Sequence, residues 1–124
     1  MVNINEIKKL LVTIPEIKFA YLFGSYAKKT ADSKSDVDIA VFVDEKFNLF
    51  DTKLKIHHAL EITLNKDIDI VALNNVKNFN LLQDILDNNI LLKESKDDFR
   101  IMFELSKEHE IMDYIAFKRM INVA

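Results

Sequence analysis

The sequence predicts an α/β fold (of the α+β kind) in which one mixed β-sheet is flanked by helices. Two mostly apolar runs, residues 36–43 and 67–73, have the length and composition of buried strands. Segments with helical spacing alternate with such runs along the chain, which favours a layered α/β arrangement. The 124 residues include one Gly and one Pro, so no linker is visible, and we expect residues 1–124 to form a single domain.

The chain opens with a predicted helix and strand. Asn5 is a candidate cap for a short helix through about Leu11. Pro15 prevents the helix from continuing, because proline lacks an amide hydrogen and its ring crowds the preceding turn. Residues 17–23 are rich in β-branched and aromatic side chains and predict a strand.

The next segment predicts a turn, a loop and a buried strand. Gly24 and Ser25 follow the first strand directly, and a helix can begin at residues 26–29. Residues 30–35 form a polar loop. Residues 36–43 are almost entirely apolar after an acidic start, so we expect a central strand that is buried on both faces.

The second half of the chain continues the alternation. Residues 50–64 have helical spacing, with Asp51 as the candidate cap. Residues 67–73 predict a third strand, 81–86 lie in another helix, and 90–92 are expected to form an edge strand. The buried stripe of the 50–64 helix is expected to include Leu54, Ala59, Leu60 and Leu64.

A long C-terminal helix completes the predicted fold. It starts at Ser95 or Asp97, hence from about residue 96, and continues to about Val123. We expect its apolar side chains to be core, although they could also dock a partner. These side chains are Phe99, Met102, Phe103, Ile111, Tyr114 and Ile115.

Composition and charge narrow the class of protein. The absence of Cys excludes disulfides and thiolate metal sites. Lys plus Arg total 17 and Asp plus Glu total 20, which gives a net charge of 17 − 20 = −3 and argues against a broad nucleic-acid-binding surface. The early charges Glu6, Lys8 and Lys9 are incompatible with a signal peptide or a membrane span, so we expect a cytoplasmic protein without membrane association.

Two carboxylates at the start of the central strand indicate a cation site. Asp36 and Asp38 are two residues apart, so in a strand they project from the same face with about 7 Å between their α-carbons. Two unpaired carboxylates in that setting repel each other and lose hydration. A divalent cation removes both penalties, and Mg²⁺ prefers such oxygen ligands together with phosphate oxygens.

Asp69 offers a third carboxylate from the next predicted strand. Three carboxylates on neighbouring strands can hold two metal ions about 3.5–4 Å apart, the arrangement used for in-line displacement at phosphorus. Asp69 is then also the candidate base for an acceptor hydroxyl. Asp67 lies two positions earlier on the same face and remains an alternative third ligand, although Lys66 beside it favours a loop position.

The segment before these carboxylates has the features of a phosphate-binding turn. Gly24 lets the backbone turn sharply and lets a phosphate approach closely, and a following helix would direct free amide groups toward that phosphate. Ser25 adds a hydroxyl donor, and Ser35 is a further candidate nucleotide contact. Short motifs such as Gly-Ser and Asp-x-Asp usually have no catalytic role when they occur alone, so the prediction rests on their combination and order.

This combination resembles the DNA polymerase β-like nucleotidyltransferase superfamily, and most closely its minimal stand-alone members. The matching residues are Gly24, Ser25, Asp36, Asp38 and Asp69, within the pieces YLFGSYA, SDVDIAV and DIDIVAL. The resemblance implies the polymerase β-like palm fold, Mg²⁺ as cofactor, with two ions, and ATP as substrate. It also implies an antitoxin that transfers AMP to a tyrosine of a HEPN-domain RNase toxin, in a homo- or hetero-oligomer.

Two alternatives remain open at this point. One keeps the chemistry but uses a small-molecule acceptor, as in the aminoglycoside nucleotidyltransferases, which usually carry an additional helical domain for that acceptor. The other is a non-catalytic module that only binds the toxin. The sequence does not identify the acceptor, the preferred base of the donor, the number of AMP units or the oligomeric state.

Overall fold

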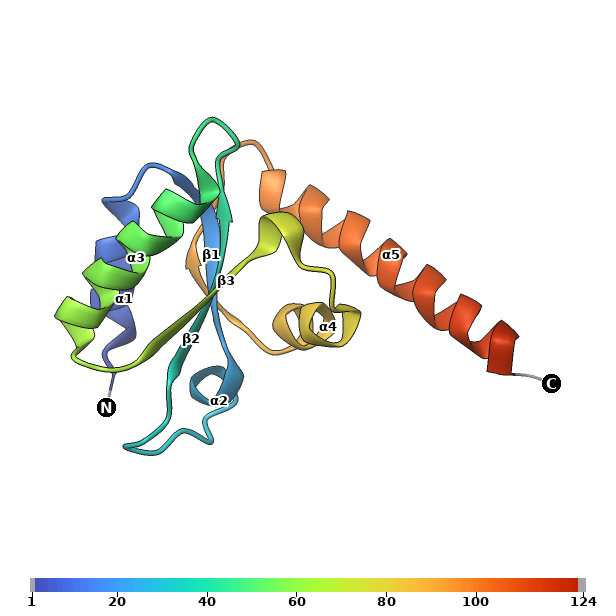
Figure 1. Cartoon of the computed structure of the whole chain (residues 1–124), viewed down its shortest axis with the longest axis horizontal. Helices are drawn as coiled ribbons and strands as arrows, with labels where there is room; N and C mark the ends of the chain where they lie inside the picture. The colour runs from blue at the N-terminus through green and yellow to red at the C-terminus, as the bar shows by residue number, and fades with distance from the viewer. Residues whose placement is uncertain (1, 123–124) are drawn as a thin grey trace.

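A computed structural model describes residues 2–122 and contains one four-stranded sheet (Figure 1). Its strands, β1 (Ile17–Phe23), β2 (Val37–Val43), β3 (Ile68–Ala72) and β4 (Ile90–Lys93), lie in the order β3-β2-β1-β4. β1 is antiparallel to both β2 and β4, whereas β2 and β3 are parallel. The expected mixed sheet, with its central second strand and its edge strand at β4, is therefore confirmed.

Helices cover both faces of this sheet (Figure 1). Along residues 2–122, no helix is both long enough and apolar enough to span a bilayer. The helical elements are α1 (Ile4–Val12), α2 (Gly24–Ala27), α3 (Leu49–Leu64), the 3₁₀ helix η1 (Leu73–Asn75), α4 (Phe79–Asp87) and α5 (Phe99–Asn122).

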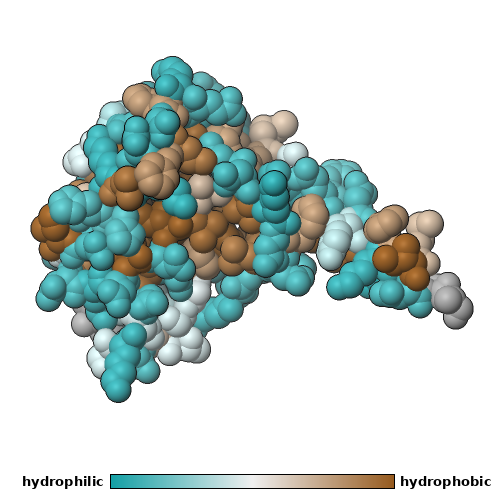
Figure 2. All heavy atoms as spheres, viewed as in Figure 1, coloured by the Kyte–Doolittle hydropathy of each residue, from teal (hydrophilic) through white to brown (hydrophobic). Residues whose placement is uncertain are grey.

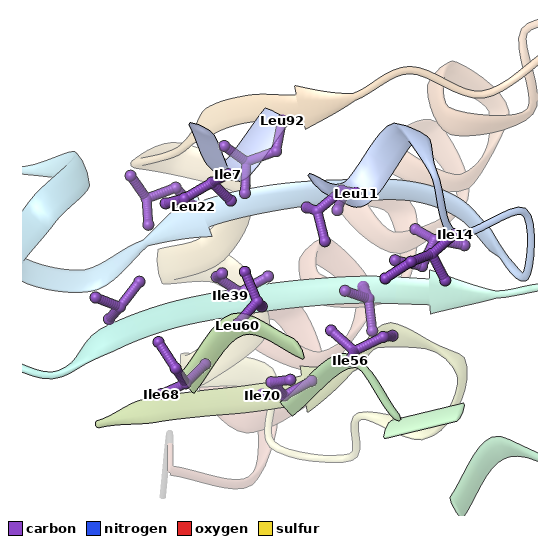
Figure 3. Packing of buried hydrophobic residues seen from close by; sticks show 14 of the residues in the cluster. Ile7, Leu11, Ile14, Leu22, Ile39, Ile56, Leu60, Ile68, Ile70 and Leu92 are labelled. Atoms are coloured by element: carbon purple, nitrogen blue, oxygen red, sulfur yellow. The ribbon is translucent and has the colours of Figure 1, made fainter. Parts of the chain in front are cut away.

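The face beneath α1 and α3 is closed by aliphatic side chains. Ile7 and Leu11 of α1 and Ile56 and Leu60 of α3 are fully buried against the strands. Figure 3 shows these side chains meeting those of β2 and β3, such as Ile39. Burial of a side chain of this size contributes about 1.5–3 kcal/mol, so this layer supplies much of the stability of the domain.

The opposite face, beneath α4 and α5, is aromatic. Phe19 and Phe42 stack with their ring centroids 5.6 Å apart. From α5, Phe99 and Phe103 contact Phe42 at centroid distances of 5.0 and 5.5 Å. These contacts attach the first turns of α5 to the sheet.

Two predicted helix caps are wrong by two or three residues. The side chain of Asn3, rather than Asn5, caps α1 by accepting a hydrogen bond from the amide of Asn5 at 2.9 Å. Asn48, rather than Asp51, caps α3 by accepting from the amide of Asp51. In each case a second good capping residue lies upstream, and the earlier start adds backbone hydrogen bonds without loss of the cap.

The predicted buried stripe of α3 contains one error. Leu54 is 54% exposed, whereas Ile56 and Leu60, one turn apart, are fully buried. The helix is apolar on more than one side, so its spacing alone does not determine which side meets the sheet. Ala59 and Leu64 are partly buried, as expected for the margins of the packed side.

The boundaries of three other elements also differ from expectation. β2 begins at Val37, so Asp36 precedes the strand, and β3 is shorter at both ends than residues 67–73. α5 begins at Phe99 because Asp97 and Asp98 both have a left-handed φ of 57°, which a right-handed helix cannot include. The predicted end at Val123 lies outside the described residues.

Candidate active site

The turn after β1 requires glycine for two independent reasons. Gly24 has φ of +71°, a conformation that side chains rarely adopt. A Cβ placed on Gly24 would lie 2.2 Å from Oδ2 of Asp38, so the carboxylate of Asp38 would have to move to admit a side chain at this position. The lone glycine of the chain therefore brings the backbone directly against the carboxylate of the Asp-x-Asp motif.

The helix expected after this turn begins earlier than predicted and is short. α2 is one turn, Gly24–Ala27, rather than a helix beginning at residues 26–29. Lys28 ends it, and Lys29 has a left-handed φ of 61°. One turn still leaves its first amide groups without helical partners, but it has no extended macrodipole.

The three predicted carboxylates come from the same end of the sheet. Asp38 pairs with Phe23, the last residue of β1, and it lies in register with Asp69 on the parallel strand β3. Residues directly opposite in a sheet project from the same face, which brings Asp38 and Asp69 together. Asp36 lies one residue before β2, at the same end of the sheet.

The electrostatics of Asp38 reflect this crowding. Burial raises the pKa of Asp38 above its ordinary value, and the negative charges of Asp69 and then of Asp36 raise it further. Within residues 2–122, none of these three carboxylates forms a salt bridge with Lys, Arg or His. The site therefore holds concentrated negative charge that the described residues do not neutralise.

The same residues fit a divalent cation without forming a complete ligand cage by themselves. In the described part of the chain, no three His, Cys, Asp or Glu side chains are close enough together to hold a metal ion. The donors are carboxylate oxygens, the ligand type that Mg²⁺ prefers, and Mg²⁺ usually completes its shell with phosphate oxygens and water. A cation that arrives with a nucleoside triphosphate would relieve the repulsion among these carboxylates.

Asp67 and Asp69 have different surroundings. The backbone carbonyl of Asp67 accepts a hydrogen bond from the amide of Val37 at 3.0 Å. This bond joins the two chain segments just where the parallel strands β2 and β3 begin. Asp67 lines a polar depression of about 500 Å³ together with Asp36 and Lys66, whereas Asp38 and Asp69 are not among its lining residues. Asp67 is not among the groups that raise the pKa of Asp38, whereas Asp69 is.

The two candidate serines also differ. Ser25 is half-buried in α2, directly after Gly24, whose backbone lies against Asp38. The hydroxyl of Ser35 donates to a carboxylate oxygen of Asp32 at 3.3 Å and accepts from the amide of Asp32 at 2.9 Å. These bonds give Ser35 a structural role in the loop that leads to Asp36.

Two lysine contacts near the site were not apparent from the sequence. Lys66 donates to the carbonyl of Ser33 at 3.2 Å and so ties down the loop before the Asp-x-Asp motif. Lys28 forms an ion pair with Asp84 of α4 at 2.9 Å, which connects the turn after β1 to the helical layer. Both pairs join residues far apart in the chain, and no local pattern identifies such partners.

Comparison with known proteins agrees with this geometry. Residues 5–98 match the family model described as polymerase beta, nucleotidyltransferase. The chain belongs to this nucleotidyltransferase family. The match includes the turn after β1 and all three predicted carboxylates, and it ends one residue before α5.

Two curated relatives are named as protein-modifying members of this kind. A candidate protein adenylyltransferase of Methanocaldococcus jannaschii is 36% identical over 77 residues, which are 60% of this chain and 82% of that protein. The protein adenylyltransferase MntA of Shewanella oneidensis is 38% identical over 72 residues, or 57% of this chain, and the match spans about half (51%) of MntA.

A solved structure is similar over almost the whole chain. It is a crystal structure of a toxin–antitoxin complex with AMP-PNP, and the match has a TM-score of 0.79 and 28% identity. It covers 97% of this chain and 95% of the other. Because so little is left uncovered, the shared architecture includes most of α5 as well as the catalytic fold.

Proposed function

We propose that this chain is an antitoxin that transfers AMP from ATP to a tyrosine of a HEPN-domain RNase toxin. The observation that carries the proposal is the meeting of Gly24 with Asp38, and of Asp38 with Asp69, at one end of the sheet. The named activity of the two relatives and the ATP analogue in the similar complex support this donor and a protein acceptor. ATP and Mg²⁺ are abundant in the cytoplasm, where we place the reaction.

The residues divide into a phosphate-binding part and a metal-binding part. Gly24 and Ser25 would hold the β- and γ-phosphates, because the first amide groups of the one-turn helix α2 have no helical partners. Asp36, Asp38 and Asp69 would hold two Mg²⁺ ions. When bound, these ions supply positive charge that stabilises the phosphoryl group and the departing pyrophosphate.

The transfer itself is a substitution at phosphorus. The tyrosine oxygen forms a bond to the α-phosphorus of ATP, and the bond from that phosphorus to the pyrophosphate oxygen breaks. The tyrosine proton passes to the carboxylate of Asp69, the most exposed of the two in-register aspartates. The products are an AMP–tyrosine phosphodiester and pyrophosphate.

The decisive experiment uses ATP labelled in its α-phosphate, Mg²⁺ and a purified HEPN-domain toxin as the acceptor. We expect label on the toxin with the native chain and none with the double variant Asp36→Asn, Asp38→Asn. ATP labelled in its γ-phosphate should leave the toxin unlabelled, because pyrophosphate departs. Label that persists in the double variant would refute the metal-site assignment.

A matched pair of single variants tests the third carboxylate. Asp69→Asn should reduce the rate of transfer by roughly 10²–10⁴-fold, the usual contribution of a general base. Asp67→Asn changes the same chemical group two residues away and should leave the rate within a few-fold. The reverse ranking would move the catalytic role to Asp67.

Replacing the toxin with aminoglycosides in the same assay tests the small-molecule alternative. Label on the small molecule and none on the toxin would establish a different acceptor. Binding of the toxin without any label would identify a non-catalytic module.

A further inference from the structure

α5 presents an apolar stripe on the side that faces away from the domain. Of the thirteen large hydrophobic side chains that are exposed in residues 2–122, eight lie on α5. Four of them, Met102, Leu105, Met112 and Met120, are 54–75% exposed and fall within about 80° of one another at 100° per residue. We call these four residues the outer stripe. His109 and Ala116 fill the heptad positions between them.

The domain's own core does not cover this stripe, because α5 is fixed by its opposite side. The hydroxyl of Tyr21 in β1 donates to Glu104, and Arg100 donates to Glu104 at 3.0 Å and to Glu94 at 2.6 Å. Ile111, the one buried residue of α5, lies about 180° from Met102. Rotation of the helix to bury the outer stripe would break all these contacts.

The free end of α5 extends beyond the sheet. Figure 1 shows the helix projecting from the body, and Figure 2 shows hydrophobic side chains near its end. At 1.5 Å per residue, its 24 residues span about 36 Å. A helix that is apolar on two sides, one packed and one exposed, indicates a missing partner.

Two comparisons separate α5 from the catalytic unit. The nucleotidyltransferase family match ends at residue 98, immediately before the helix. The similar chain from a toxin–antitoxin complex covers 97% of this chain and so shares most of α5. The helix is therefore an addition to the catalytic domain that recurs in a chain solved as part of a complex.

The charges beside the outer stripe argue against a second copy of this chain as its occupant. Glu108 and Asp113 are both exposed and flank the stripe on its two sides. In a parallel pair, Glu108 would face Asp113 of the other copy, five residues further along. In an antiparallel pair that aligns Leu105 with Met120, the two Asp113 side chains would meet. Both arrangements place like charges together.

α5 is also connected to the candidate active site. Phe79 of α4 stacks on Tyr114 of α5, with ring centroids 4.9 Å apart. At its other end, α4 is held to the phosphate-binding turn by the Lys28–Asp84 ion pair. A protein held on α5 would thus be positioned relative to the bound nucleotide through two defined contacts.

We propose that the outer stripe docks the toxin that this chain modifies, through an apolar helix of the toxin flanked by Lys or Arg. Basic residues suit this partner because an RNase needs positive charge to bind RNA, and here they would face Glu108 and Asp113. This inference rests on the proposed function, since it identifies the docking surface for the same acceptor. Docking on α5 raises the local concentration of the acceptor tyrosine at the site.

The test measures, by calorimetry, the dissociation constant of the native chain for the HEPN-domain toxin used in the transfer assay. Met112→Lys should weaken binding at least about 30-fold, the effect of removing a central apolar anchor. Methionine and lysine are both good helix formers, so circular dichroism should be unchanged. The matched control is Ile62→Lys on α3, at a site with nearly the same exposure (68% against 67%), which should bind like the native chain.

Charge reversal gives a second, independent readout. The double variant Glu108→Lys, Asp113→Lys should weaken binding, and the native complex should weaken as salt is raised. ATP affinity should be unchanged in every variant, because none of these residues is at the candidate active site.

Two results would overturn the proposal. One is unchanged toxin binding by Met112→Lys combined with Leu105→Lys. The other is sedimentation showing a native dimer that Met112→Lys converts to a monomer, which would assign the stripe to a second copy. Stripe-dependent binding of a toxin that is never labelled would refute the transfer reaction and leave the docking surface standing.

Discussion

The two faces of the sheet differ in how fully helices cover them. The face beneath α1 and α3 is aliphatic and closed, with Ile39, Ile56 and Leu60 fully buried. The face beneath α4 and α5 is aromatic and only partly covered, and the same face of β2 that buries Phe42 carries Asp38 at the open end. One face is thus built for stability, and the other combines packing with a charged site and a projecting helix.

This difference shows how a domain of this size separates stability from chemistry. Burial and then repulsion by Asp69 and Asp36 raise the pKa of Asp38, so the carboxylate site costs stability in the absence of a cation. The closed aliphatic face can offset that cost because its residues take no part in the site. Variants at the carboxylate site should therefore reduce activity more than stability, and variants on the aliphatic face should reduce stability more than activity.

The largest effect is expected for Asp38→Asn, which should lower the rate of AMP transfer by at least about a hundredfold. In metal-free buffer the same variant should be as stable as the native chain or more stable at neutral pH. Because the pKa of Asp38 is higher in the native state than in the unfolded state, the native carboxyl still holds its proton at a pH where the unfolded one has lost it. Asp38 therefore makes the free energy of unfolding fall as the pH rises above about 3.8, the ordinary value for Asp. Urea unfolding across pH in EDTA should show that fall reduced in the variant.

The next largest effect is expected for Leu60→Ala on the closed face. Removal of a fully buried leucine side chain should reduce the free energy of unfolding by about 2–5 kcal/mol. The transfer rate of the folded protein should stay within about twofold, because Leu60 packs between α3 and the sheet, on the side away from the carboxylates. A large loss of rate at full folding would show that the two faces are coupled.

A smaller effect is expected for Tyr21→Phe, which removes one contact between β1 and the base of α5. Burial and the neighbouring Glu104 raise the pKa of the Tyr21 hydroxyl, so it remains a neutral donor at all ordinary pH values. Loss of this hydrogen bond to a charged acceptor should cost about 1–3 kcal/mol of unfolding free energy, measured in urea. ATP affinity should be unaffected, and a change in it would place α5 within the nucleotide site.

The smallest effect is expected for Lys28→Ala at the junction between the turn and α4. The Lys28–Asp84 pair is 43% and 35% exposed on its two side chains, so its loss should change stability by less than about 1 kcal/mol. If it positions α4 and α5 relative to the nucleotide, the KM for the toxin should rise while the affinity for ATP is unchanged. Asp84→Ala should behave in the same way, because it removes the same pair.

The candidate site could be predicted largely from local sequence. Only a short connection between two adjacent strands separates Gly24 from Asp36 and Asp38. Once these two strands pair, the three residues necessarily lie at the same end of the sheet. Asp69 required the further assumption that its strand lies beside β2, which the parallel register with Asp38 bears out. Lys66 and its contact with Ser33 could not be predicted, since such a bond depends on how two loops fold back on each other.

By itself, the sequence determined the strands, the order of the elements and the acidic cluster, because these depend on composition and on spacings of a few residues. The tertiary structure decided which sides of α3 and α5 are buried, since each helix carries apolar residues on more than one side and only the sheet selects among them. That selection left Leu54 exposed on α3 and the outer stripe exposed on α5. A helical repeat describes one helix, whereas burial is a property of the surface against which that helix packs.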